Sequence, residues 1–199
     1  MAPIVIPFRG LAGKQRIDAP EELREQLALA MLGDVLSGCL ETDRTLVVTR
    51  DEEGKQLARD LGAELVEDPG GGQGSAVAAA LAELPDRPAL VVNADLPCLV
   101  PRDLRTLAGA AELGAFALVE ANDGTTNALA LPRPKIFAPL YGAGSAARFR
   151  DHAISLRYET STAAIPNLVD DVDTRADLER LALRVGPRTK AALGVLRGL

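Results

Sequence analysis

The chain has 199 residues, of which 47% are hydrophobic and 25% are charged, and it carries a formal net charge of −6. This length and composition suit a single globular domain covering residues 1–199. The acidic balance argues against a nucleic-acid partner, and the lack of a long apolar run or a charged leader argues against a membrane partner, so a cytoplasmic protein is expected.

Strand and helix patterns alternate along the first half of the chain. Short, β-branched apolar runs predict parallel strands covered on both faces, and these are residues 3–8, 45–49, 63–67 and 89–93. Helical spacing is found at residues 21–40, 52–61, 75–84 and 101–113, and Asp18 with Glu21 predicts an N-cap for the first of these helices. The alternation predicts a doubly wound α/β sheet with right-handed crossovers.

After Gly114 the alternation weakens. Two apolar runs, residues 116–119 and 127–131, are separated by an Asn-Asp-Gly turn signal, which predicts an antiparallel excursion at one side of the sheet. Residues 175–184 and 187–199 are expected to be helices.

The composition also limits the chemistry. His152 is the single histidine, so neither a Ser-His-Asp nor a Cys-His triad can form unless it is the base, and an exposed helical histidine is the simpler interpretation. Cys39 and Cys98 form no C-x-x-C pattern and are expected to be small core residues. An enzyme of this composition would work by charge neutralisation and positioning.

Asp171 and Asp173 stand two residues apart, directly before the expected helix at 175–184. In an extended segment, side chains at i and i+2 leave the same face, so both carboxylates can converge on a divalent cation. Thr174 and Asp177 predict a cap that opens the helix. A turn followed by an N-cap, without a metal, explains the same residues, and both interpretations stay open.

Polar residues follow the apolar strand at 89–93. Ligands of open α/β sheets bind at the carboxyl ends of the strands, so Asp95 is either a metal ligand or a cap for the helix near Pro101. Asn93, at the same strand end, is expected to contact a nucleotide.

Two loops suggest anion binding. Gly70, Gly71, Gly72 and Gly74, with Ser75, let backbone amides approach a ligand before a helix start, although the spacing matches neither a dinucleotide fingerprint nor a Walker A loop. After the first strand, Arg9, Gly10, Lys14 and Arg16 suggest a triphosphate clamp. A flexible surface turn and solvated surface charge are the respective alternatives.

Residues 142–147 match G-x-G-x-x-A, but no clean strand precedes them and they do not belong to the first βα unit. We therefore reject a nicotinamide site there. A small anion could bind against Ser145 and the following helix N-terminus.

Together these motifs resemble the phospholactate/phosphoenolpyruvate guanylyltransferases of deazaflavin coenzyme F-420 biosynthesis, a family of GT-A-like nucleotidyltransferases. The resemblance covers nearly the whole chain and agrees in motif order and approximate spacing. The matching stretches are residues 7–9, 14–17, 69–72, 95–97, 125–129, 142–145 and 171–174.

The resemblance implies a single-domain Rossmann-like (GT-A-like) fold, with a mostly parallel central sheet flanked by helices. It implies transfer of GMP from GTP to phosphoenolpyruvate or 2-phospho-L-lactate, with release of pyrophosphate. Asp95, Asp171 and Asp173 would hold Mg²⁺, as two ions. Thr126, Gly142 and Ser145 would grip the phospho-acid, while the first loop and the glycine loop would hold GTP. The next enzyme of the pathway, which accepts the unstable product, is an expected partner.

The chain also departs from the family pattern. Arg9 replaces the usual Lys, and Gly74-Ser75 stands where the family commonly has Leu-Asn, which leaves guanine selectivity open. Other nucleotidyltransferases of this fold, with 3-phosphoglycerate, molybdopterin or a sugar phosphate as acceptor, are the nearest alternatives. A non-catalytic nucleotide-binding protein is a more distant one.

Overall fold

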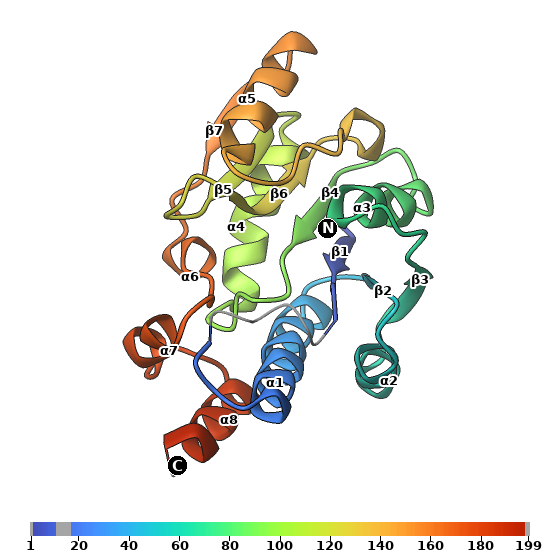
Figure 1. Cartoon of the computed structure of the whole chain (residues 1–199). Helices are drawn as coiled ribbons and strands as arrows, with labels where there is room; N and C mark the ends of the chain where they lie inside the picture. The colour runs from blue at the N-terminus through green and yellow to red at the C-terminus, as the bar shows by residue number, and fades with distance from the viewer. Residues whose placement is uncertain (1, 11–16, 198–199) are drawn as a thin grey trace.

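The computed structural model describes residues 2–10 and 17–197, and within them a seven-stranded sheet forms the centre of the molecule (Figure 1). The strands are β1 (Ile4–Pro7), β2 (Thr45–Thr49), β3 (Glu64–Glu67), β4 (Ala89–Val92), β5 (Phe116–Glu120), β6 (Thr126–Leu131) and β7 (Thr160–Thr162). Their order across the sheet is β3-β2-β1-β4-β6-β5-β7. The expected α/β fold is confirmed.

Strand β6 is the one strand of the described sheet that runs against its neighbours. It pairs antiparallel with both β4 and β5, whereas the pairs β1/β2, β1/β4, β2/β3 and β5/β7 are all parallel. This confirms the predicted antiparallel excursion. It also brings the start of β6 to the side of the sheet where the carboxyl ends of β1 and β4 lie.

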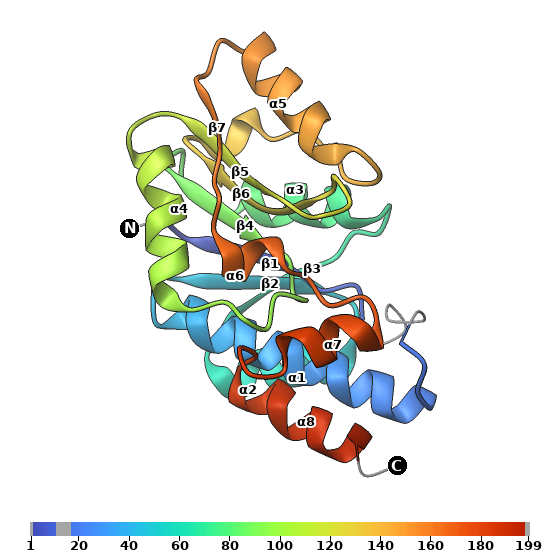
Figure 2. The ribbon, with the colours of Figure 1, turned by 90° about the vertical axis from the view of Figure 1, so that its left-hand side faces the viewer.

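The helices cover both faces of the sheet (Figure 2). They are α1 (Glu21–Leu40), α2 (Glu52–Leu61), α3 (Gln73–Ala82), α4 (Pro101–Glu112), α5 (Ser145–Ser155), α6 (Pro166–Val169), α7 (Arg175–Leu181) and α8 (Pro187–Arg197), with a 3₁₀ turn at Pro134–Ile136. One core cluster joins the sheet to α1, α2, α4 and α6, and a second joins its opposite face to α3 and α5. A third cluster packs α7 and α8 against the outer side of α1.

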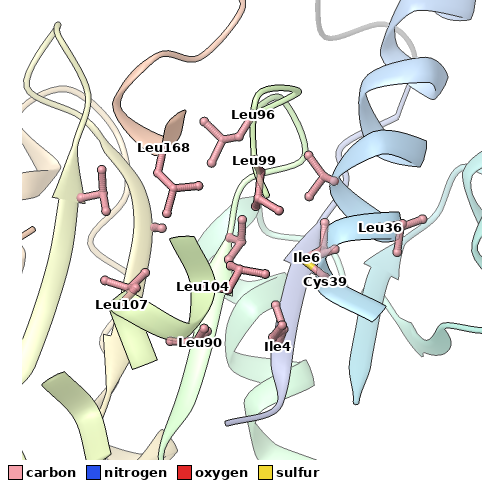
Figure 3. Packing of buried hydrophobic residues seen from close by; sticks show 14 of the residues in the cluster. Ile4, Ile6, Leu36, Cys39, Leu90, Leu96, Leu99, Leu104, Leu107 and Leu168 are labelled. Atoms are coloured by element: carbon pink, nitrogen blue, oxygen red, sulfur yellow. The ribbon is translucent and has the colours of Figure 1, made fainter. Parts of the chain in front are cut away.

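The loop after β4 is anchored in the first of these clusters (Figure 3). Leu96 and Leu99 are 0% and 7% exposed, and they pack in the same cluster as Leu168 of α6. The backbone around Asp95 is therefore held by buried side chains on its carboxyl side. Cys39 and Cys98 are both buried, as predicted.

Some local predictions are wrong. Strand β3 is half-exposed rather than covered on both faces, because it lies at the edge of the sheet. Asp18 does not cap α1: Pro20 is the N-cap residue and makes no side-chain capping bond, since the helix begins directly after the proline and leaves Asp18 outside.

His152 is half-buried rather than exposed, because α5 packs beside the 3₁₀ turn and His152 Nε2 lies 2.8 Å from the Ile136 carbonyl oxygen. Helix α7 ends at Leu181, earlier than expected. Among the described residues, no helix is long and apolar enough to cross a membrane.

Candidate active site

Three aspartates meet at the edge of the sheet where β4 ends. Asp95 follows β4, while Asp171 and Asp173 precede α7, and one carboxylate oxygen from each lies within 4.8 Å of the others. All three residues are half-buried. Such a set of carboxylate oxygens fits a hard divalent cation, for which oxygen is the preferred ligand. The predicted convergence of these three side chains is found in the structure.

Backbone contacts align the two segments that carry these aspartates. Val172, between the two later aspartates, is fully buried in the third core cluster, so its neighbours point the other way. The Val172 N–H donates to the Asp95 carbonyl oxygen at 3.2 Å. A second bond, from the Gly186 N–H to the Pro97 carbonyl oxygen at 2.8 Å, ties the same loop to the start of α8.

The capping functions considered for the aspartates belong to other residues. Thr174 Oγ1 accepts from the Asp177 N–H at 3.2 Å, and Asp177 Oδ2 accepts from the Thr174 N–H at 2.9 Å, which confirms the predicted capping box of α7. At α4, Asp103 Oδ2 accepts from the Val100 N–H at 3.0 Å. In the described structure, α4 is therefore capped by Asp103 and α7 by the Thr174/Asp177 capping box, and the metal assignment of the three aspartates stays a prediction.

Asp170, directly before Asp171, is held by two guanidinium groups. Arg180 Nη1 lies 2.6 Å from its Oδ1 and Arg184 Nη1 lies 2.8 Å from its Oδ2. Burial by itself would raise the pKa of Asp170, but the hydrogen bonds from both arginines outweigh this effect and hold the pKa below its usual value.

Two cavities meet at the aspartate cluster, with volumes of about 470 and 450 Å³. The first runs along the end of β1 and reaches α1, and the second reaches the β5–β6 turn and the start of α5. The residues that line both cavities are Arg9, Gln73, Asn93, Asp95 and Asp173. Two ligands could thus occupy neighbouring spaces and meet beside the aspartate cluster.

Asn93 stands at the wall between the two cavities. Its Oδ1 accepts from Gln73 Nε2 at 2.8 Å, and its Nδ2 donates to the Thr126 carbonyl oxygen at 3.1 Å. Gln73 also lines a third cavity of about 110 Å³. Sequence reasoning missed Gln73, although its place as the first residue after the glycine run is a signal that could have found it.

The second cavity combines buried hydroxyls with a helix start. Ser145 Oγ donates to Thr126 Oγ1 at 3.0 Å, and these residues are 0% and 2% exposed. Gly142 lines the same cavity, so the three residues predicted to grip the phospho-acid lie together. Because Ser145 begins α5, the amides and the positive dipole end of that helix favour an anion here.

Arg148 fixes the turn that precedes α5. Its guanidinium donates to the carbonyl oxygens of Leu140, Tyr141 and Ala143, at distances from 2.6 to 3.3 Å. Gly142 in this turn has φ +110°, a conformation that favours glycine.

The glycine loop has positive φ angles only at its first three glycines, because Gly74 and Ser75 already belong to α3. Gly70, Gly71 and Gly72 have φ values of +85°, +86° and +94°. Asp68 Oδ1 accepts from the Gly70 N–H at 2.7 Å, and Arg50 Nε donates to the Asp68 carbonyl oxygen at 2.9 Å. These bonds define the loop's shape. Gly72 lines the third cavity, whereas Gly70 and Gly71 lie outside the lining of the described cavities.

Gly74 is needed for packing. A Cβ built on Gly74 would lie 2.5 Å from Pro139 Cβ, so only glycine lets α3 approach this proline. Neither Gly74 nor Ser75 lines the described cavities, and a nucleotide-binding role for them stays a prediction.

The charge of the second cavity is strongly negative. Its described lining holds four carboxylates, Asp95, Asp123, Asp171 and Asp173, against the single guanidinium of Arg9. Lys14 and Arg16 lie outside the described residues. An anionic ligand could enter such a site only with cations to offset the carboxylates, which agrees with a metal at the cluster. Gly10, with φ +88°, lines the first cavity beside Arg9.

Comparison with known proteins identifies the family. Residues 21–159 match the family model of the MobA-like NTP transferase domain. A phosphoenolpyruvate guanylyltransferase of Streptomyces coelicolor is 40% identical over 94% of this chain and 93% of its own length. The chain belongs to the phosphoenolpyruvate guanylyltransferase family. A second guanylyltransferase of this family, from Streptomyces scabiei, is 37% identical over 95% of this chain and 94% of its own length.

Solved structures agree with the guanylyltransferase family at the level of the fold. A protein of Desulfovibrio desulfuricans assigned to the nucleotide-diphospho-sugar transferases has a TM-score of 0.75 and 15% sequence identity. The match covers 100% of this chain and 96% of that one. The resemblance inferred from the motifs is confirmed, and the protein is a nucleotidyltransferase.

Proposed function

We propose that this chain transfers GMP from GTP to phosphoenolpyruvate and releases pyrophosphate. The observation that carries the proposal is the pair of cavities that meet at the three aspartates. The relatives' names support phosphoenolpyruvate as the acceptor. 2-Phospho-L-lactate and 3-phosphoglycerate, which differ from it by a few atoms, are the acceptors to test against it.

The nucleotide would occupy the first cavity. Arg9 and Gly10 line it, and Asn93 lines both this cavity and the second one. In the proposal, Lys14 and Arg16 join Arg9 on the triphosphate. The loop 70–75, with Gly70, Gly71, Gly72, Gly74 and Ser75, approaches the base or ribose.

The acceptor would occupy the second cavity. Thr126 Oγ1 accepts the Ser145 hydroxyl, and a hydroxyl that accepts keeps its own proton for donation to an anion. Gly142 and the first amides of α5 supply further donors. These groups would orient the phospho-acid so that its phosphate faces the α-phosphate of GTP.

The chemistry needs no histidine. A phosphate monoester, with a second pKa of about 6, is already anionic at neutral pH. One of its oxygens forms a bond to the α-phosphorus of GTP, the bond from that phosphorus to the bridging oxygen breaks, and pyrophosphate leaves with the electron pair. Mg²⁺ held by Asp95, Asp171 and Asp173, as two ions, would neutralise the repulsion between the two anions. Positioning by the cavity walls supplies the alignment.

The wider setting follows from the family resemblance. We place the reaction in deazaflavin coenzyme F-420 biosynthesis and in the cytoplasm, where GTP is available. The product, a mixed anhydride of two phosphates, is unstable, and the next enzyme of that pathway is the partner that would accept it.

The test is a pyrophosphate-release screen of four nucleoside triphosphates against the three phospho-acids with Mg²⁺. We expect GTP with phosphoenolpyruvate to give the fastest release. Asp173→Asn should slow it by about 10² to 10⁴, the range seen when electrostatic stabilisers are lost. Asp86→Asn, which removes a carboxylate paired with Lys135 and Arg133 on the surface, is the matched control and should leave the rate unchanged.

Pyrophosphate release with none of the twelve combinations, while GTP still binds, would replace the proposal by a non-catalytic nucleotide-binding protein. Release with a sugar phosphate in place of the three acids would identify another acceptor class on the same fold.

A further inference from the structure

Arg180, at the end of α7, contacts both sides of the segment that carries two of the three clustered aspartates. Its Nη1 lies 2.6 Å from Asp170 Oδ1, directly before the segment. Its Nη2 lies 3.2 Å from Asp177 Oδ1, in the first turn of α7. No other arginine among the described residues forms ion pairs with both of these carboxylates.

Asp177 also forms hydrogen bonds with the backbone of this segment. While its Oδ1 faces Arg180, its Oδ2 accepts from the Asp173 N–H at 3.2 Å and from the Thr174 N–H at 2.9 Å. The Thr174 hydroxyl donates to the same oxygen at 2.7 Å. Residues 170–177 are thus closed into a ring through the Arg180 guanidinium, which we call the Arg180 bridge.

The ring encloses Asp171 and Asp173 and leaves them little freedom. Val172 between them is buried, and the two ends of the segment are held by the Arg180 bridge. Ligand side chains keep a productive geometry only where neighbouring groups fix their backbone, and removing such outer partners typically weakens metal binding about 10- to 100-fold.

We propose that Arg180 is a positioning residue for the metal site: it fixes the backbone on both sides of Asp171 and Asp173 and so sets the affinity of the aspartate cluster for a divalent cation. The inference rests on the metal site of the proposed function. It does not depend on which nucleotide or acid reacts there.

A purely electrostatic role of Arg180 would have the opposite sign. A guanidinium near three carboxylates repels a divalent cation, so removing its charge should tighten metal binding if charge alone mattered. Loss of positioning should weaken it. The direction of the change therefore separates the two roles.

Arg184 and Arg175 supply matched controls on the same side of the molecule. Arg184 also pairs with Asp170, at 2.8 Å, and its second nitrogen donates to Asn167, so it holds only the near side of the segment. Arg175 pairs with Glu179 at 3.2 Å on the exposed surface of α7. All three substitutions to Met remove one positive charge.

The experiment measures binding of Mn²⁺ alone, by electron paramagnetic resonance, to the wild type and to Arg180→Met, Arg180→Lys, Arg184→Met and Arg175→Met. We expect Arg180→Met to weaken binding about tenfold, Arg184→Met to weaken it less, and Arg175→Met to leave it unchanged. Arg180→Lys should also weaken binding, because an ammonium group cannot span both carboxylates as the guanidinium fork does.

The Mg²⁺ dependence of enzyme activity gives a second measurement of the positioning role. The Mg²⁺ concentration for half-maximal pyrophosphate release should rise with Arg180→Met, while the rate at saturating Mg²⁺ stays close to that of the wild type. Thermal melts check that each variant folds. If Arg180→Met does not fold, Arg180→Lys takes its place in the comparison.

Each outcome decides a different point. If the wild type binds Mn²⁺ and the Arg180 variants bind it equally tightly or more tightly, the positioning role is overturned, while the metal site itself stands. Equal weakening by all three Met variants would also overturn it, because the effect would then not depend on the contacts that distinguish Arg180 from Arg184 and Arg175. Failure of the wild type to bind Mn²⁺ would refute the metal site of the proposed function itself.

Discussion

Asn127 ties the sheet to the helix that leads into the aspartate pair, and its replacement gives a sharp test of the structure. The side chain is 1% exposed, and its Nδ2 donates to the carbonyl oxygens of Leu168 and Val169, both at 3.0 Å. These are the last two residues of α6, whose terminal carbonyls have no partner within the helix.

The expected cost of Asn127→Ala follows from these two bonds. A buried acceptor that loses its donor costs about 1 to 3 kcal/mol. The bond to Val169 is less buried than the bond to Leu168, so the cost of losing it lies near the lower limit. We therefore expect the free energy of unfolding to fall by about 2 to 4 kcal/mol. For a chain of this size, a loss of about 3 kcal/mol corresponds to a fall in Tm of roughly 6 to 12 °C.

Asn127→Asp keeps the size of the side chain and reverses its hydrogen bonding. An ionised carboxylate facing two carbonyl oxygens has no donor, so this variant should be less stable than Asn127→Ala at neutral pH. The pKa of the introduced carboxyl should be raised in the folded state, so its destabilising effect is present at high pH and eases as the pH falls and the group protonates.

Urea unfolding followed by circular dichroism, at several pH values, measures these effects. Asn122→Ala is the control, because its amide makes one exposed contact of 3.4 Å, with Asp170, and should change stability by less than about 0.5 kcal/mol. A loss below about 0.5 kcal/mol for Asn127→Ala would refute the reasoning, as would an Asn127→Asp variant that is more stable than Asn127→Ala at neutral pH.

Three further predictions concern other parts of the fold. Asp34 is 7% exposed and accepts from the first two amides of α8 that follow Pro187, at 3.0 and 2.8 Å, so Asp34→Ala should cost about 2 to 4 kcal/mol in urea unfolding, with Asp34→Asn intermediate. Burial raises the pKa of the Cys39 and Cys98 thiols, so above the ordinary thiol pKa these thiols ionise only in the unfolded chain, and the free energy of unfolding should fall as the pH rises. A thiol reagent at pH 8 should label neither residue until urea is added. Arg148→Met should raise the KM for the phospho-acid about three- to tenfold with a smaller effect on kcat, because it frees the turn beside Gly142; an unchanged KM in steady-state kinetics would separate that turn from acceptor binding.

The features that could be predicted from the sequence are those set by local pattern. The strands β1, β2 and β4 are short, continuous apolar runs, which can be recognised without reference to the rest of the chain. Asp95, Asp171 and Asp173 could be singled out as candidates because two simple geometric rules, side chains at i and i+2 and ligands at strand ends, act over short stretches, and the family resemblance joined them into one set.

The remaining features depend on contacts between distant segments. Strand β7 has the polar sequence Thr-Ser-Thr and no apolar alternation, so only its pairing with β5 defines it. Gly74 is required because Pro139 approaches α3, which no local pattern records. Likewise, the burial of His152 follows from tertiary packing against the 3₁₀ turn. Such contacts override local propensity and leave no local signature.

The bond between Val172 and the Asp95 carbonyl also has a consequence for folding of the chain during synthesis. The strands that form most of the sheet emerge from the ribosome first, whereas the segment that carries Asp171 and Asp173 emerges after β7. A contact between segments so far apart in sequence forms slowly and late. The growing chain can therefore assemble most of the lining of the first cavity before Asp171 and Asp173 join Asp95, so the proposed metal site is completed only when the last helices form.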